Sequence, residues 1–329
     1  MRGEAGVRFE LIQQTVSNPD NTMSVTELCD LQHVSRSGYY NWLSSEERRQ
    51  ERERQDQEDF DLILGVYQSH QYSRGAQGIH MGLLHQGVTM NVKKIRRLMK
   101  KFNLICPIRK ANPYRRMAKA LKTSNTAENL VQREFESHGP RRILLTDITY
   151  LQYSGGTAYL STILDAFTKQ ILAYRVSSSL EVNFVLETLQ DLIENHGKEL
   201  DPETIIHSDQ GCHYTSYKYI DLVKSSKLRQ SMSRKGNCWD NAPQESFFGH
   251  MKDEIKKPIQ HCHSSEEVEA VIDEWIRYYN NERYQWQLAK LAPNEFYKYY
   301  MTGIYPIEGV KVPATQLGSS APSNGTTTA

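Results

Sequence analysis

The first third of the chain has apolar residues at helical spacing. Helices are expected over 8–17, 24–31, 35–43, 58–70, 76–86 and 91–102. Ser24 and Ser35 stand at positions where helix N-caps are preferred. Within the first three segments, 24–31 and 35–43 with the short turn between them fit a helix-turn-helix, whose second helix can enter the major groove of DNA. They fit a plain three-helix cluster equally well, and the sequence leaves both open.

The segment 91–102 has two distinct surfaces. An apolar stripe at i, i+3, i+6, i+7 and i+10 predicts a helix packed on a core, and it consists of Val92, Ile95, Leu98, Met99 and Phe102. Six cations occupy the other faces: Lys93, Lys94, Arg96, Arg97, Lys100 and Lys101. Such a helix is typical of proteins that hold the phosphate backbone of DNA.

From about residue 140 the pattern changes to short β-branched and aromatic runs. Strands are expected over 143–151, 157–166, 170–177, 204–209 and 228–233. The first three follow one another through tight turns, whereas helices over 181–196 and 215–226 separate the later ones. This order predicts an α/β core with an RNase H-like mixed five-stranded sheet, completed by helices from about 241 and 265.

These patterns divide the chain into consecutive units. We expect a helix-turn-helix-like unit (1–45), a charged helical linker (46–57), a second helical DNA-binding unit (58–105), a basic linker (106–139), the RNase H-like core (140–300) and a disordered tail (301–329).

Composition narrows the class of protein. Hydrophobic residues make up 38% and charged residues 24% of the chain, as in soluble globular proteins. The sequence contains no apolar run long enough for a membrane span, and its start lacks the pattern of a secretory signal. The five cysteines form no CxxC pair, which favours a reducing compartment and a cytoplasmic location.

The net charge of +1 conceals an uneven distribution. Residues 91–122 contain twelve Lys or Arg and no Asp or Glu. A solvated surface is the simplest explanation of a charge run, but this one would repel itself and attract phosphate. We therefore expect double-stranded DNA as a partner, with Arg115 and Arg116 among the contacts.

Three carboxylates stand at positions that favour catalysis. Asp147 interrupts the apolar first strand, Asp209 ends the fourth, and Glu245 lies on the helix that follows. The first and fourth strands are neighbours in the RNase H-like order, so the three carboxylates are expected to meet beyond the strand ends. Many other acids are available by chance, and the nearest alternatives are Asp165, Asp240, Asp253 and Glu254.

Three carboxylates at one point repel one another unless a cation balances them. Oxygen ligands select hard ions, so Mg²⁺ is expected, with Mn²⁺ able to substitute. Two such ions activate an attacking oxygen and stabilise a leaving one during in-line attack on a phosphodiester. The pattern thus predicts phosphoryl transfer without a covalent protein nucleophile.

Several strings resemble those of a known enzyme family. They are TDITYL (146–151), YLSTILDAFTK (159–169), HSDQGCHYTS (207–216), SRKGNCWDNAPQESFFGHMKDE (233–254) and YYNNERYQWQLAKLAPNEF (278–296). In this order they resemble the DDE transposases of insertion sequences that have two reading frames, and in particular the product of the second frame. More broadly, they resemble retroviral-type integrases. The resemblance covers about 1–300 and implies cleavage and joining of DNA at the element's ends.

The resemblance also assigns residues. It implies that Asp147, Asp209 and Glu245 are the metal ligands and that Lys252, seven residues after Glu245, contacts DNA near the cut. Asn237, Asn241 and Gln244 are expected at the DNA around the site. His207 fits either a ligand-orienting role or a packed strand histidine, and Arg283 either a DNA contact or a structural salt bridge.

Two departures from the family pattern bear on partners. The stretch YSRGAQGI (72–79) replaces a more basic family string, and no sustained heptad repeat is visible. The first departure means that no residue-level role is assigned to 72–79, and the second means that the first-frame protein or a fusion with it is expected as a further partner. Because two DNA ends must be brought together, a homo-oligomer on DNA is also expected. Two rival hypotheses are a non-catalytic DNA-binding modulator of transposition and an RNase H-like nuclease that cleaves without joining.

Overall fold

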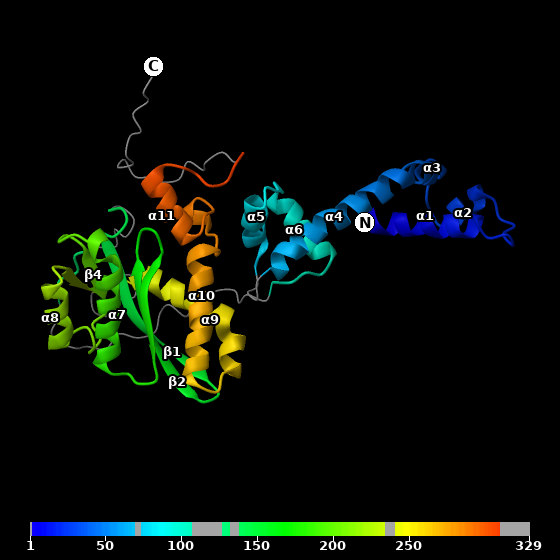
Figure 1. Cartoon of the computed structure of the whole chain (residues 1–329). Helices are drawn as coiled ribbons and strands as arrows, with labels where there is room; N and C mark the ends of the chain where they lie inside the picture. The colour runs from blue at the N-terminus through cyan, green and yellow to red at the C-terminus, as the bar shows by residue number, and fades with distance from the viewer. Residues whose placement is uncertain (1, 70–73, 107–126, 132–137, 234–240, 310–329) are drawn as a thin grey trace, which may run out of the picture.

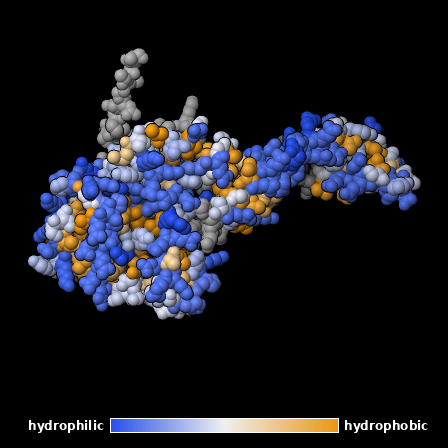
Figure 2. Space-filling model, in the orientation of Figure 1, coloured by the Kyte–Doolittle hydropathy of each residue, from blue (hydrophilic) through white to orange (hydrophobic). Residues whose placement is uncertain are grey.

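The computed structural model describes residues 2–69, 74–106, 127–131, 138–233 and 241–309. An α/β core forms one end of the molecule, and the N-terminal helices project from it as an arm (Figure 1). Hydrophilic side chains cover most of the visible face of the arm's long helix. Hydrophobic side chains gather at the tip of the arm, farthest from the core (Figure 2).

The tip of the arm is a three-helix cluster. Its helices are α1 (Arg2–Val16), α2 (Val25–Leu31) and α3 (Arg36–Ser44). Ser24 forms a capping box with Glu27, and the Ser35 side chain accepts a hydrogen bond from the Gly38 N–H, so both predicted N-caps are confirmed. Ile12 and Tyr39 are buried at the centre, and all three helices contact one another.

One continuous helix, α4 (Glu46–Gln68), forms the shaft of the arm. The charged stretch is helical as predicted, and it runs without a break into the helix expected from residue 58. Pairs one turn apart support its exposed part, since Arg54 binds both Glu51 and Glu58. Its C-terminal half then carries the apolar residues that pack on the next two helices.

Helices α5 (Ala76–His85) and α6 (Val92–Lys101) pack against the end of α4. Ile95 and Leu98 from the predicted stripe are fully buried, and Phe102 stacks on Phe60 with ring centroids 4.2 Å apart. Asn91 caps α6 by accepting a hydrogen bond from the Lys93 N–H at 2.8 Å. The predicted apolar stripe is therefore the core of this unit.

The core domain is built on a five-stranded sheet of order β3-β2-β1-β4-β5. Its strands are β1 (Ile143–Tyr153), β2 (Gly156–Asp165), β3 (Ile171–Ser177), β4 (Ile205–Ser208) and β5 (Arg229–Met232). β1 to β3 form an antiparallel meander, whereas β4 pairs parallel with both β1 and β5. The predicted mixed sheet, with its first and fourth strands adjacent, is confirmed.

Helices cover both faces of the sheet. On one face lie α7 (Val182–His196) and α8 (Tyr217–Ser225), and on the other α9 (Ala242–His261) and α10 (Ser265–Asn281). Successive residues of β1 alternate between the two, because Leu145 packs with α9 and Leu144 with α7. Helix α11 (Pro293–Thr302) and the short 3-10 turns Gly197–Glu199 and Trp286–Leu288 complete the described fold.

Helix α5 rests directly on the core. His85 at its end stacks on Tyr284 with ring centroids 3.6 Å apart, and its Nε2 lies 3.2 Å from the Glu295 carboxylate. At the other end, the Arg74 guanidinium lies over the Tyr278 ring at 5.6 Å. Both ends of α5 are thus anchored. In the described part of the chain, no helix combines the length and apolar character needed to cross a bilayer.

Candidate active site

Asp147 lies in the middle of β1 on the face that α9 covers. It follows Ile143 and Leu145 in the strand alternation, and both of those residues pack in the α9 cluster. Its Oδ1 accepts a hydrogen bond from the Ile148 N–H at 2.8 Å, and its Oδ2 accepts one from Asn241 Nδ2 at 3.2 Å. The carboxylate is therefore partly buried and held at both oxygens.

Asp209 follows directly on β4, the parallel neighbour of β1. Its side chain is exposed, and its Oδ1 accepts a hydrogen bond from the Gly211 N–H at 2.8 Å. A Cβ on Gly211 would lie 2.9 Å from that oxygen, so glycine lets the turn close on the carboxylate. The end of β4 thus presents Asp209 to solvent beside the middle of β1.

Glu245 lies in the first turn of α9. Phe247, Phe248 and Met251 bury one side of this helix against the sheet, which leaves Glu245 and Lys252 exposed. Because seven residues span about two helical turns, Glu245 and Lys252 share one side of α9. The helix therefore brings a carboxylate and an ammonium group to the edge where Asp147 and Asp209 lie.

Electrostatic coupling joins these groups. Burial, together with the neighbouring Asp209 and Glu245 carboxylates, raises the pKa of Asp147 to about 8, whereas the Ile148 N–H and Lys252 act in the opposite direction. A carboxyl in this position keeps its charge at neutral pH only when a cation is near. No three His, Cys, Asp or Glu side chains converge to metal-ligating separation within the described residues. The metal site predicted from the sequence stays a prediction.

Comparison with known proteins identifies the family. Two family models described as "Integrase core domain" match residues 137–238 and 226–293, and one described as "HTH-like domain" matches 54–112. The putative transposase InsK for insertion sequence element IS150 of Escherichia coli K12 is 33% identical over 236 residues. That match covers 71% of this chain and 81% of the relative. The chain belongs to the DDE transposase family of insertion sequences.

Two further matches complete the comparison. The insertion element IS600 31 kDa protein of Shigella sonnei is 31% identical to this transposase, with 83% of this chain and 98% of that protein covered. The simian T-cell lymphotropic virus intasome aligns over 70% of this chain and 72% of that one, at 13% identity and a TM-score of 0.42. The HTH-like match lies on α4 to α6, so the helix-turn-helix assignment of 1–45 remains open.

Buried polar residues near the three candidate carboxylates have structural partners. His207 is fully buried and its Nδ1 lies 2.8 Å from Ser231 Oγ, which fits the packed strand histidine. Gln244 is fully buried and donates to Thr162, so the DNA contact predicted for it is wrong in this fold. Asn241 is buried and donates a hydrogen bond to Asp147. This bond indicates a positioning role that sequence reasoning missed. The DNA contact of Asn241 stays a prediction.

Two of the alternative acids, Asp165 and Glu254, are held in structural contacts. Asp165 is fully buried, pairs with Arg141 at 2.8 Å, and accepts the N–H groups of the turn after β2. Glu254 pairs with Arg283 at 2.8 Å and accepts a hydrogen bond from Trp275 Nε1 at 2.9 Å. Arg283 is therefore the structural salt bridge of the two options, and these acids are not free to form the catalytic centre.

Helix α6 divides its six cations between two surfaces. Lys94 pairs with Asp59, Arg97 makes a bidentate pair with Asp56 at 2.6 and 2.7 Å, and Lys101 reaches Glu53 and Asp56. Across the described chain, the other three have no acidic partner: Lys93, Arg96 and Lys100. Three of the six predicted DNA contacts are thus already held by α4.

Some predicted residues lie outside the described ranges. These are Arg115 and Arg116 of the basic stretch, Asn237 before α9, and the alternative acid Asp240.

Proposed function

We propose that Asp147, Asp209 and Glu245 form the catalytic centre of this transposase and act on double-stranded DNA at the ends of its element. The observation that carries the proposal is the shared electrostatic field at Asp147. The charges of Asp209, which follows β4, and of Glu245 and Lys252, both on α9, act on the Asp147 carboxyl of β1. Three acids at one edge of a sheet repel one another and need a cation to be charged together.

The donor set fits a divalent cation with a preference for oxygen. Asp147, Asp209 and Glu245 would hold Mg²⁺, two ions in the usual arrangement, with Mn²⁺ as a substitute. Bound there, the metal would polarise the attacking and leaving oxygens of a phosphodiester. Asn241 would hold the Asp147 carboxylate in place, and Lys252 would bind the phosphate next to the cut.

The reaction has two balanced steps. A water oxygen bonds to phosphorus, the P–O3′ bond breaks, and the departing oxygen takes up a proton to leave a free 3′-OH. That hydroxyl then attacks a second phosphodiester, and the bond to that strand's 3′ oxygen breaks. Two DNA ends take part, so a homo-oligomer on DNA is the working form, with the first-frame protein or a fusion to it as a further partner.

The test is a strand-transfer assay with the purified chain, a labelled duplex of the element's own end, and Mg²⁺ against an EDTA control. Asp209→Asn should lower joining by more than about a thousandfold, because it weakens the hold on the metal. DNA binding should stay intact. Normal joining by this variant would overturn the assignment. Binding without products from the wild type would favour a modulator, unless the fusion with the first-frame region restores joining.

A further inference from the structure

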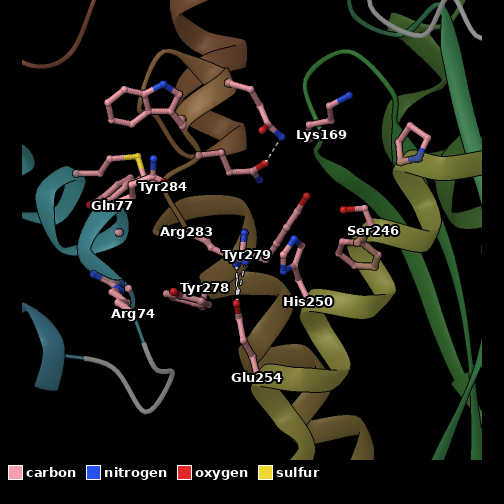
Figure 3. Close-up of a pocket in the computed structure, with 18 of the residues that line it drawn as sticks. Arg74, Gln77, Lys169, Ser246, His250, Glu254, Tyr278, Tyr279, Arg283 and Tyr284 are labelled. Atoms are coloured by element: carbon pink, nitrogen blue, oxygen red, sulfur yellow. Dashed lines mark hydrogen bonds and ion pairs between the residues drawn. The ribbon is translucent and has the colours of Figure 1, made fainter. Parts of the chain in front are cut away.

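A cleft separates the HTH-like unit from the catalytic core. It has a volume of about 850 Å³, and its walls come from the start of α5, from α9, and from the end of α10 with the loop after it. Arg74 and Gln77 face His250 and Ser246 across the opening (Figure 3). The helix that carries Glu245 thus forms one wall of the cleft, through Ser246, His250 and Glu254.

The cleft is positively charged. Arg74, Arg96, Lys169 and Arg283 line it, and among the described lining residues Glu254 is the one acid. Glu254 is paired with Arg283, so the positive charges of Arg74, Arg96 and Lys169 remain in excess among the described lining residues. Burial and the nearby Arg283 lower the pKa of His250, so this ring is a neutral hydrogen-bonding group at physiological pH. Such a lining attracts an anion.

Helix α5 opens toward this cleft at its N-terminus. Its N-cap is Gly75, which has no side chain to cap the helix, and Ala76 and Gln77 follow it in the lining. The N–H groups of a first helical turn lack partners within the helix and favour negative charge. A Cβ on Gly75 would meet nothing within 4 Å, so the approach to these N–H groups is open.

Arg74 supplies the second, independent observation. Only 9% of its surface is exposed, and its Nη2 has no hydrogen-bond partner within the described chain. A guanidinium this far buried without a full set of acceptors is costly, because its donors have left water without replacement. The contact between its guanidinium and the Tyr278 ring holds Arg74 beside the N-terminus of α5. The group is therefore poised to bind an anion that enters the cleft.

We infer that this cleft is a binding site for a phosphodiester of the DNA backbone, held by Arg74 and the first turn of α5. The inference deepens the proposed function, on which it rests. DNA is favoured over a small anion because Arg96 also belongs to the exposed row of Lys93 and Lys100 on α6. A backbone lying along that row continues into the cleft and leads to α9.

The decisive experiment measures affinity for a duplex of the element's end over a series of NaCl concentrations. Removing one phosphate contact should reduce the slope of log K against log [salt] by about one. Arg74→Gln should show this reduction and bind about tenfold more weakly. Arg54→Gln, an equal charge change on the exposed shaft of α4, should leave both quantities unchanged. An unaltered slope and affinity in folded Arg74→Gln would overturn the site.

Mapping with single methylphosphonate linkages locates the contact. At least one neutral linkage should weaken wild-type binding yet make no further difference to Arg74→Gln. If the thermal melt shows that Arg74→Gln is unfolded, the exposed Arg96→Gln replaces it in the comparison. Identical sensitivity of the wild type and the folded variant to every linkage would contradict the proposal. Binding needs no chemistry, so a wild type that shows the mapped contact but fails to join DNA, both alone and fused to the first-frame region, would sink the proposed function and leave this site standing.

Discussion

Charges are balanced differently at two places in the molecule: at the α4–α6 contact and at the proposed catalytic centre. Between the helices, Asp56 receives a bidentate pair from Arg97 and a bond from Lys101, so each charge meets its opposite. Around Asp147, two further carboxylates gather and raise its pKa. The first arrangement is complete within the protein, whereas the second needs a cation from outside. Incomplete charge balance therefore marks the place where a ligand acts.

The sharpest way to test this contrast uses two glutamates of one helix. Glu245→Gln should lower DNA joining by more than about a thousandfold with little change in thermal stability, because the residue is exposed and serves the metal. Glu254→Gln should retain joining while folded but lose about 2 kcal/mol of unfolding free energy. It leaves the largely buried Arg283 without its counter-charge.

Joining rates and urea unfolding curves of both variants provide the measurement, since each serves as the other's control. The comparison fails if Glu245→Gln unfolds like Glu254→Gln, because the two acids would then be equally structural. It also fails if Glu254→Gln loses joining at full stability, which would place Glu254 among the catalytic groups.

The sequence could predict that the strand positions of Asp147 and Asp209 are neighbours, because these positions follow from local pattern. A charged residue inside the apolar run 143–151 and another at the end of 204–209 could be placed as soon as β1 and β4 were expected to be neighbours. The register that brings them together arises from strand periodicity and from the order of helices between strands. Family strings then selected Asp147, Asp209 and Glu245 from the many acids.

The pairings between distant elements could not be predicted in this way. Arg97 and Asp56 are separated by 41 residues, and their contact depends on how α6 is rotated against α4. The sequence showed six cations around a stripe but not which of them face an acid. The hydrogen bond from Asn241 to Asp147 likewise joins residues 94 apart. Such partners are set by packing, which a linear pattern does not contain.

The next test asks whether Asn241 positions the Asp147 carboxylate or contacts DNA. Asn241→Ala should reduce joining by about 10- to 100-fold, because residues that orient a metal ligand have effects of this size. DNA affinity should not change, and the Mg²⁺ concentration needed for half-maximal joining should rise. Asn281→Ala, an exposed position in the last turn of α10, is the control. If instead affinity falls while the rate per bound complex is kept, Asn241 contacts DNA as the sequence predicted.

The smallest expected effect comes from releasing the cations held by α4. Asp56→Asn should free Arg97, while Lys101 keeps its pair with Glu53, and should raise DNA affinity by about two- to tenfold at low salt, with a steeper salt dependence. Asp61→Asn removes the same charge from the same helix, where Asp61 accepts a bond from Gln57 and touches no α6 cation, and should raise affinity less. Equal gains in the two variants would show that only net charge matters.

The stability of the Asp56 variant against pH completes this test. The Arg97 hydrogen bonds hold the pKa of Asp56 well below its usual value. A carboxyl with a lowered folded-state pKa stabilises the fold above its unfolded value of about 4, and that stabilisation is lost as the pH falls below it. The wild type should therefore exceed Asp56→Asn by at most about 1 kcal/mol at pH 7, since salt screens these half-exposed pairs. The difference should shrink toward pH 2; a constant difference would mean that Asp56 acts by shape and not by charge.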